Sequence, residues 1–204
     1  MPTPATAFGH PVVPGPRTSS GTSAEPASAD TATTPDPTTR AERPTDPLLG
    51  YAVETAADPT LLDRLPLDAT RRTWIRLSAP AGCDAWLIGW PPDTRTGWHD
   101  HGGSRGAFHV LRGELVESTV RVNTLPTRIR ERVPMAPHQP PPLRLTTGRG
   151  RSFGPSHVHD VHNDSPTTHA VSLHLYSPAL PLMRRYAITD GDFLLQTIEH
   201  AEDW

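Results

Sequence analysis

Histidine is the residue type whose number and spacing in this chain first indicate chemistry. The sequence contains 11 histidines, and two of them, His99 and His101, flank Asp100 in a His-x-His pattern. On a β-strand, residues i and i+2 point to the same face. Two imidazoles at this spacing can therefore reach one metal ion while Asp100 points away. A lone His-x-His pair also occurs by chance or on a solvated strand, so a metal site needs a further ligand.

A further candidate ligand lies in residues 157–163, where His159 and Asn163 are spaced as His-x3-Asn. A His-x-His pair, followed later by a glycine-rich turn and one more histidine, is the pattern of the cupin superfamily, and this chain resembles it. The matching positions are His99, His101 and Gly113 in the first cupin motif and Gly148, His159 and Asn163 in the second. The resemblance implies one metal ion bound by three histidines. His157 has the same strand parity as His159 and is a candidate neighbour of the site or an alternative ligand.

One departure from the cupin pattern affects the chemistry of the site. The glutamate of the first motif should fall at position 105 or 106, and Arg105 and Gly106 stand there. Three imidazoles without a carboxylate leave a divalent ion with its full charge, which favours an anionic ligand such as a thiolate. Three protein ligands also leave coordination positions open for substrate and O₂, unlike a closed structural zinc site.

A second polar group follows in residues 170–178. On a strand, Ser172, His174 and Tyr176 share one face, where a hydroxyl, an imidazole and a phenol can form a hydrogen-bond relay. The alternative is that these residues form the polar outer face of a strand whose core face carries Val171 and Leu173. Periodicity alone leaves both orientations open.

Together these runs resemble the cysteine dioxygenase family, the thiol dioxygenases of the cupin superfamily. The resemblance rests on residues 98–104, 159–161 and 172–178 and extends over about residues 50–190. The last run is the most specific, because cupins in general lack it. The resemblance implies the all-β cupin jelly-roll barrel as the fold.

The resemblance also implies the site residues and the reaction. A mononuclear Fe(II) is bound by His99, His101 and His159, and Ser172, His174 and Tyr176 form the relay. The expected activity is oxidation of L-cysteine by O₂ to cysteine sulfinate. Several members of the family link a cysteine covalently to the tyrosine. That cysteine is replaced by Gly106 here and Cys83 lies outside the motif, so we expect a bacterial type without the cross-link.

In this family an arginine pairs with the substrate carboxylate, as its planar fork matches a carboxylate bidentately. Arg76 is our candidate, and Arg71 and Arg72 are its nearest competitors. Relatives that oxidise 3-mercaptopropionate often have glutamine at this point, so Arg76 favours cysteine. The alternatives are a dioxygenase of another small thiol such as 3-mercaptopropionate, a cupin isomerase or epimerase with Zn²⁺ or Mn²⁺, and a non-catalytic metal-binding cupin.

The elements that must position these residues follow from hydrophobic periodicity. Residues 48–65 have helical spacing interrupted by Pro59, which predicts two short helices as an N-terminal cap. From residue 74 onward the period is two, with about nine short strands separated by Gly and Pro. This pattern predicts an all-β jelly roll or barrel.

Composition defines the domain and its partners. Residues 1–47 contain ten prolines and ten threonines and few apolar residues, so we expect a disordered tail before one domain at residues 48–204. The net charge of −3 gives no electrostatic footprint for nucleic acid. The absence of a long apolar run predicts no membrane span. We expect a cytoplasmic protein, since no secretory signal is evident and a single cysteine permits no intrachain disulfide. A monomer is favoured, with a small thiol and O₂ as partners.

Overall fold

The computed structural model of the chain describes residues 46–201. The predicted disordered tail, residues 1–47, lies outside the described residues except for its last two positions, and residues 202–204 also lie outside them. The predicted division of the chain at residue 47 therefore stays a prediction. No helix among the described residues is long and apolar enough to cross a membrane.

The first element, helix α1 (Pro47–Ala56), begins where the sequence supplies a cap and a proline. Asp46 Oδ1 accepts hydrogen bonds from two backbone N–H groups of the first turn, at 2.9 and 3.2 Å. These bonds satisfy donors that a helix leaves open at its start. Pro47 has no N–H to lose at the first helical position. A short 3₁₀ helix, η1 (Leu61–Arg64), follows, so the two predicted helical segments are present on either side of Pro59.

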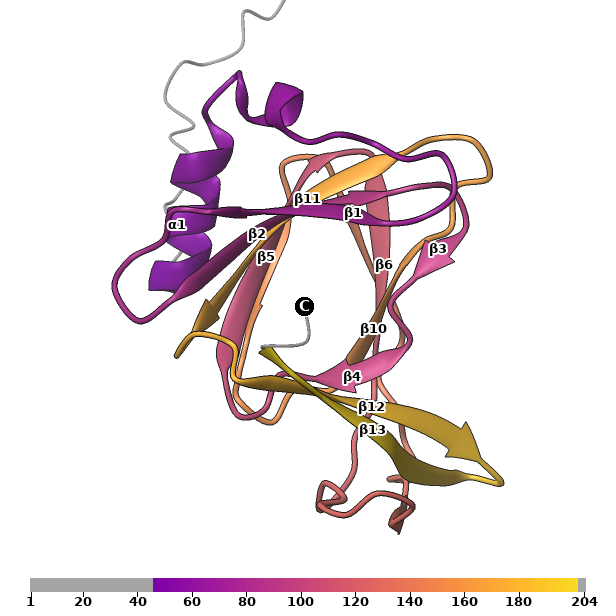
Figure 1. The fold of residues 1–204 in the computed structure, drawn as a ribbon. Coiled ribbons are helices and arrows are strands. Elements are labelled where there is room, and N and C mark those ends of the chain that lie inside the picture. The colour runs from indigo at the N-terminus through magenta and orange to yellow at the C-terminus, as the bar shows by residue number, and fades with distance from the viewer. Residues whose placement is uncertain (1–45, 202–204) are drawn as a thin grey trace, which may run out of the picture. The chain divides into compact units, whose positions relative to one another are not determined.

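The remaining elements are strands in two antiparallel sheets (Figure 1). The five-stranded sheet has the order β1 (Thr73–Leu77), β2 (Asp84–Trp90), β11 (Ala170–Ser177), β5 (Arg105–Arg112) and β9 (Gly150–Phe153). The eight-stranded sheet has the order β7 (Arg132–Pro134), β13 (Asp192–His200), β12 (Leu182–Thr189), β4 (Trp98–Asp100), β10 (His159–Asn163), β6 (Glu114–Thr119) and β8 (Leu143–Thr146), with β3 (Thr94–Arg95) paired to β10. The predicted all-β fold with a small N-terminal helical cap is confirmed.

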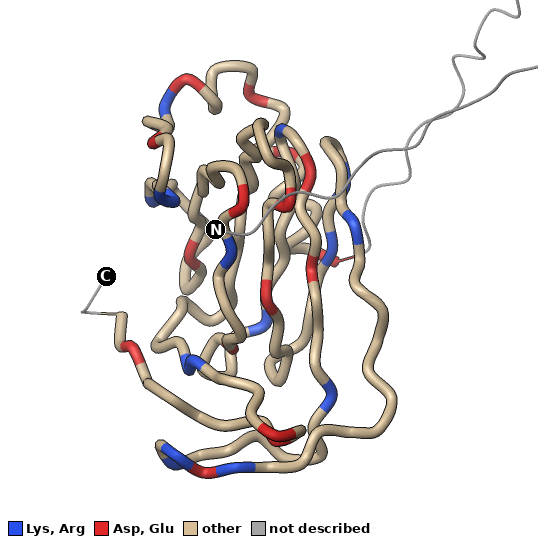
Figure 2. Tube along the Cα trace, turned by 90° about the vertical axis from the view of Figure 1, so that its right-hand side faces the viewer, with Lys and Arg blue, Asp and Glu red and all other residues tan. Residues whose placement is uncertain are grey.

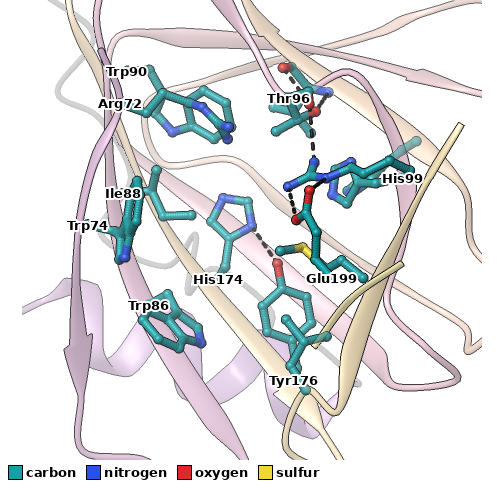
Figure 3. A pocket seen from close by; sticks show the side chains of 15 residues that line it. Arg72, Trp74, Trp86, Ile88, Trp90, Thr96, His99, His174, Tyr176 and Glu199 are labelled. Atoms are coloured by element: carbon teal, nitrogen blue, oxygen red, sulfur yellow. Dashed lines mark hydrogen bonds and ion pairs between the residues drawn. The ribbon is translucent and has the colours of Figure 1, made fainter. Parts of the chain in front are cut away.

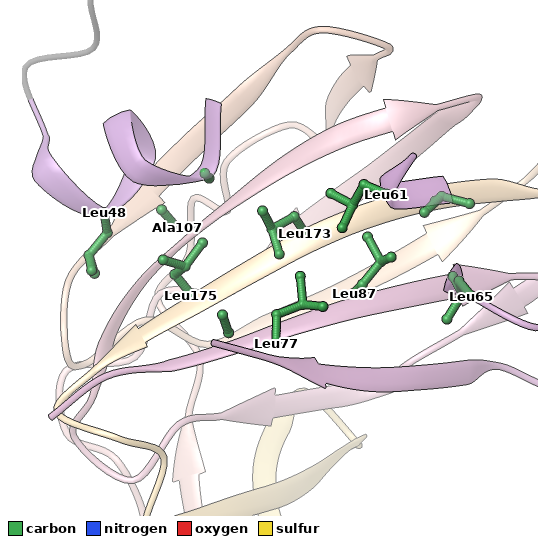
Figure 4. Close-up of a cluster of buried hydrophobic side chains, with 11 residues drawn as sticks. Leu48, Leu61, Leu65, Leu77, Leu87, Ala107, Leu173 and Leu175 are labelled. Atoms are coloured by element: carbon green, nitrogen blue, oxygen red, sulfur yellow. The ribbon is translucent and has the colours of Figure 1, made fainter. Parts of the chain in front are cut away.

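Strand β11 is buried on both faces, which resolves the orientation that periodicity left open. Leu173 and Leu175 pack under helix α1 in a cluster of buried apolar side chains (Figure 4). Burial of each such leucine stabilises the fold by roughly 1.5–3 kcal/mol. Ser172, His174 and Tyr176 alternate with them and are also buried, so they point into the space between the two sheets. Because helix α1 covers the face of β11 that carries the leucines, the opposite face with the three polar residues points into the interior.

The hairpin between β12 and β13 closes through a two-residue turn, Asp190 and Gly191. Asp190 and Gly191 have φ values of 54° and 83°, the positive values that a two-residue turn of this type requires. The pairing continues on both sides from Thr189 opposite Asp192. Register in this hairpin matters for the site, because β12 pairs in turn with β4, which carries His99.

Basic and acidic residues are interspersed along the described part of the chain (Figure 2). Several of the arginines are paired with carboxylates. Arg144, for example, pairs with both Glu114 and Asp164. The arrangement agrees with the near-neutral charge balance of the sequence.

Candidate metal centre

Three histidines from two adjacent strands converge between the sheets. His99 lies on β4, His101 directly follows that strand, and His159 begins β10, where it pairs in register with His99. One ring nitrogen from each of the three lies within 4.8 Å of the others. All three side chains are buried, with at most 4% of their surface exposed. The histidines that the sequence singled out are therefore brought together.

Hydrogen bonds fix which nitrogen of each ring is available to an ion. Nδ1 of His99 lies 2.9 Å from the carbonyl oxygen of Gly97, so this nitrogen donates and Nε2 keeps its lone pair. Nδ1 of His159 donates to Glu117 Oε1 at 2.7 Å in the same way. Neither nitrogen of His101 has a partner among the described residues, although both are buried. A buried imidazole without any partner is costly, and a metal ion at the centre of the three rings would satisfy it.

The charge state of the three rings suits the same ion. Burial lowers the pKa of His99 to about 3 and lowers those of His101 and His159 well below the ordinary value for histidine. The rings are therefore neutral at neutral pH, and the neutral imidazole is the form that binds metals. The donor set fits a divalent transition metal such as iron.

Asp100, between His99 and His101 in the chain, points away from them as the sequence predicts and holds their segment in place. It is fully buried and accepts the hydroxyl of Tyr186 at 2.6 Å and Nε of Arg184 at 3.0 Å. Its Oδ1 also accepts the backbone N–H of Gly102 at 3.0 Å. Gly102 has a φ of 61°, and a Cβ there would meet Leu182 at 2.8 Å. This network fixes the turn that directs His101 inward.

Glu117 is a residue of the site that the sequence reasoning missed. It lies on β6 with its side chain fully buried, and it accepts hydrogen bonds from His159, His157 and Arg151 at 2.7, 2.9 and 2.6 Å. Glu117, His157 and His159 also form a second group whose ligand atoms lie within 4.8 Å of one another. The available signal was that Glu117 has the strand parity of Leu115, a typical core residue.

The predicted relay is present and has an additional member. Ser172 Oγ lies 2.8 Å from His174 Nε2, and His174 Nδ1 lies 3.5 Å from the hydroxyl of Tyr176. At the other end, Nε1 of the fully buried Trp90 donates to Ser172 Oγ at 2.8 Å. Burial lowers the pKa of His174 to about 3 and raises the pKa of Tyr176. Both groups are therefore neutral at physiological pH.

A cavity of about 330 Å³ connects the metal centre with the relay. Its walls include His99, His174 and Tyr176 (Figure 3). His159 lines it as well. The other lining residues are largely apolar or aromatic and are Trp74, Trp86, Ile88, Trp90, Val161, Leu180 and Met183, together with Arg72, Thr96, Arg185 and Glu199. Trp74 is 54% exposed, so the indole lies at the surface edge of the cavity rather than in the core.

Among the arginines, the structure brings Arg72 and not Arg76 to this cavity. The side chain of Arg76 is 63% exposed, pairs with Asp84 and lies over Trp86 at 5.5 Å. The guanidinium of Arg72 lines the cavity and lies 5.3 Å from the centre of the Trp90 ring. No carboxylate among residues 46–201 forms an ion pair with Arg72, whereas Arg185 is bound bidentately by Glu199.

Phe153 occupies the space beside Gly106. A Cβ at Gly106 would lie 2.5 Å from the Phe153 ring and 2.8 Å from the backbone oxygen of Leu175. The same ring stacks on His101 at 4.9 Å and lies 6.4 Å from the ring of Tyr176. Position 106 is therefore closed to any side chain while Phe153 keeps this position.

Comparison with known proteins gives one family and a set of distant structures. The family described as cysteine dioxygenase type I matches residues 56–189. No curated protein matches the chain. The solved structures that match include the TT1209 protein from Thermus thermophilus, with 19% identity over 58% of this chain and 94% of that one and a TM-score of 0.44. A cupin superfamily protein from Desulfitobacterium hafniense matches with 8% identity over 58% of this chain and 87% of that one, with a TM-score of 0.43.

Proposed function

Since this chain belongs to the cysteine dioxygenase type I family, we propose that it is an iron-dependent thiol dioxygenase with L-cysteine as its first candidate substrate. The reaction adds both atoms of O₂ to the thiol sulfur and gives a sulfinate. Sulfur is oxidised by four electrons, O₂ is reduced by the same four, and the thiol proton goes to solvent. The observation that carries the proposal is the convergence of three buried imidazoles, one without any other partner among the described residues, beside a cavity whose walls include two of them together with His174 and Tyr176.

A ferrous ion bound by His99, His101 and His159 would supply open coordination positions for the thiolate and O₂ and the means of activating O₂. The residues of the chain bind and orient the reactants. The apolar wall excludes water from the reacting sulfur. Tyr176 can donate its hydroxyl proton in a hydrogen bond to the bound substrate or to developing negative charge on oxygen. His174 and Ser172 hold that hydroxyl in position.

Arg72, which our sequence reasoning ranked below Arg76, is the better candidate for the carboxylate of the substrate. A guanidinium that lines a cavity and has no acidic partner among residues 46–201 is available to a bidentate anion. Arg76 is held by Asp84, which also accepts the N–H of Leu180 at 2.8 Å. We expect Arg72→Gln to raise the KM for cysteine by roughly 10- to 100-fold, the cost of a charge-assisted bond of about 1.5–3 kcal/mol. Arg76→Gln is the matched control, and an equal or larger effect from it would restore Arg76 to this role.

A thiol without an amine is the second candidate substrate, with 3-mercaptopropionate as the simplest case. Glu199 is the one carboxylate among the described lining residues, and both of its oxygens are taken by Arg185. The cavity therefore offers no free carboxylate to a substrate ammonium group. A cysteine amine would have to bind the metal or a neutral acceptor, whereas 3-mercaptopropionate has no such need.

The deciding experiment loads the purified chain anaerobically with Fe²⁺, Mn²⁺ or Zn²⁺, and then adds air and one thiol at a time. O₂ uptake is recorded, and the product is analysed for a mass gain of two oxygen atoms. We expect turnover with Fe²⁺ alone, and the ratio of kcat/KM for cysteine to that for 3-mercaptopropionate identifies the substrate. Metal binding without O₂ uptake for any thiol would refute the proposal and favour a non-catalytic cupin or an isomerase.

A further inference from the structure

We propose that Trp90 is a positioning residue that fixes the direction of the Ser172–His174–Tyr176 relay, so that the hydroxyl proton of Tyr176 faces the cavity. Trp90 Nε1 lies 2.8 Å from Ser172 Oγ, and both side chains are fully buried. An indole nitrogen can only donate a hydrogen bond. In this series of hydrogen bonds, the serine, histidine and tyrosine side chains can each act as donor or acceptor, whereas the indole can act only as a donor.

The direction of the hydrogen bond between Ser172 and His174 follows from the indole donor. Ser172 has a single proton, and Trp90 already donates to its oxygen. The other side-chain contact of the hydroxyl is His174 Nε2, at 2.8 Å. If Nε2 carried a proton, two donors would face one oxygen, and the serine proton would have no acceptor among the described residues. If Nε2 accepts instead, every bond runs the same way, and successive bonds polarise one another favourably.

The direction at histidine follows in turn. A neutral imidazole carries one proton, so a ring that accepts at Nε2 carries its proton on Nδ1. Burial, which keeps the pKa of His174 low, ensures that the ring is neutral. Nδ1 lies 3.5 Å from the hydroxyl oxygen of Tyr176 and therefore points its proton at that oxygen (Figure 3). The proton of Tyr176 cannot be directed back at His174.

The consequence is a directed donor at the reaction site. Tyr176 lines the same cavity as His99 and His159. With the relay in the opposite direction, Tyr176 would donate to His174 and present only lone pairs to the substrate. Lone pairs would repel an anionic carboxylate or developing charge on oxygen. The indole at the far end of the relay therefore selects a tyrosine that donates.

The first test reads the proton on His174 directly. The full chain, labelled with ¹⁵N-histidine and loaded with diamagnetic Zn²⁺, is studied by long-range ¹H–¹⁵N NMR, which distinguishes the two neutral tautomers. We expect the Nδ1–H form of His174 in the native chain and a several-fold larger share of the Nε2–H form in Trp90→Phe. A native His174 protonated at Nε2, or an unchanged ratio in Trp90→Phe, would overturn the proposal. Because this measurement needs no turnover, its outcome is independent of the proposed function.

The second test uses kinetics and does rest on the proposed function. Trp90→Phe should lower kcat roughly tenfold, as for other partners that orient a site residue. KM is not the readout here, because the Arg72 guanidinium lies over the Trp90 ring. In a Ser172→Ala background the same substitution should change kcat less than about twofold, since the indole acts through the serine. Additive effects would contradict the relay. Trp98→Phe is the matched control, because Trp98 packs in a separate apolar cluster outside the cavity. If no variant turns over any thiol, the proposed function fails while the NMR result stands.

Discussion

Substitution of Glu117 is the sharpest test of the proposed metal centre, because we expect it to weaken metal binding. Its carboxylate accepts one hydrogen bond each from His159, His157 and Arg151 and is fully buried. The bond to Nδ1 of His159 holds that ring with Nε2 toward the ion and makes the ring more basic. Glu117→Gln keeps the size of the side chain, removes its charge, and turns one oxygen into a donor that faces other donors.

The expected loss of metal affinity in Glu117→Gln follows from these hydrogen bonds. Removal of such a carboxylate weakens metal binding by roughly 10- to 100-fold, which corresponds to 1.4–2.8 kcal/mol. The fold is destabilised separately, by roughly 1–3 kcal/mol, because buried donors lose their acceptor. Affinity must therefore be measured apart from stability. An anaerobic competition of Fe²⁺ between the protein and a coloured chelator, at a temperature well below unfolding, does this.

The same strand offers a matched control for Glu117→Gln. Glu114 lies on the same strand and pairs with Arg144 at the surface, so Glu114→Gln should leave the affinity unchanged. Native affinity in Glu117→Gln would refute the reasoning. A loss far beyond about 100-fold, with His99→Ala unaffected, would mean that the ion prefers the alternative group of Glu117, His157 and His159.

Three further predictions concern the relay, the buried histidines and the core. Tyr176→Phe should retain iron but slow sulfinate formation by roughly 10- to 1000-fold, the range for a lost donor to developing charge; an unchanged rate under O₂ saturation would remove the hydroxyl from the mechanism. In the metal-free protein His99 and His174 take up protons only near pH 3, while their unfolded forms do so below about pH 6.5. The stability that these two neutral rings contribute is therefore present above about pH 6.5 and is lost on acidification, by about 2.5 kcal/mol for the pair between about pH 7 and 5.5. The lowered pKa values of His101 and His159 act in the same direction, so urea titration at each pH should show at least this loss. Leu87→Ala, in the cluster under helix α1, should cost about 2–5 kcal/mol in the same assay while its metal affinity stays native.

The fold and the convergence of the three candidate histidines could be predicted from the sequence because both depend on short patterns. The His-x-His spacing indicates the shared side of His99 and His101, although His101 lies just beyond β4 and also depends on the turn at Gly102. Ser172, His174 and Tyr176 need only a strand with one face turned inward. What periodicity could not supply was the helix that covers the other face of β11. Once Leu173 and Leu175 are packed under α1, the polar row has no place except between the sheets.

Residues that depend on contacts between distant strands could not be predicted in this way. Arg72 and Arg76 lie four residues apart and have the same strand parity, and the sequence does not show which of them pairs with Asp84. Glu117 reaches His159 across the pairing of β6 with β10, a register that no local pattern fixes. The position of the Trp90 side chain beside Ser172 likewise depends on the register between β2 and β11.

The close approach of Gly106 to Phe153 constrains how these two positions can change in evolution. A larger residue at 106 is excluded until position 153 has become smaller, since its Cβ would overlap the ring. A smaller residue at 153, acquired first, would leave a void against His101 and Tyr176 that costs about 3–5 kcal/mol. Even with a smaller residue at 153, a Cβ at 106 would lie 2.8 Å from the backbone oxygen of Leu175, so strand β11 would also have to shift. The effects of substitutions at 106 and 153 are therefore coupled, and the glycine at 106 is required by two neighbours at once, the Phe153 ring and the Leu175 backbone.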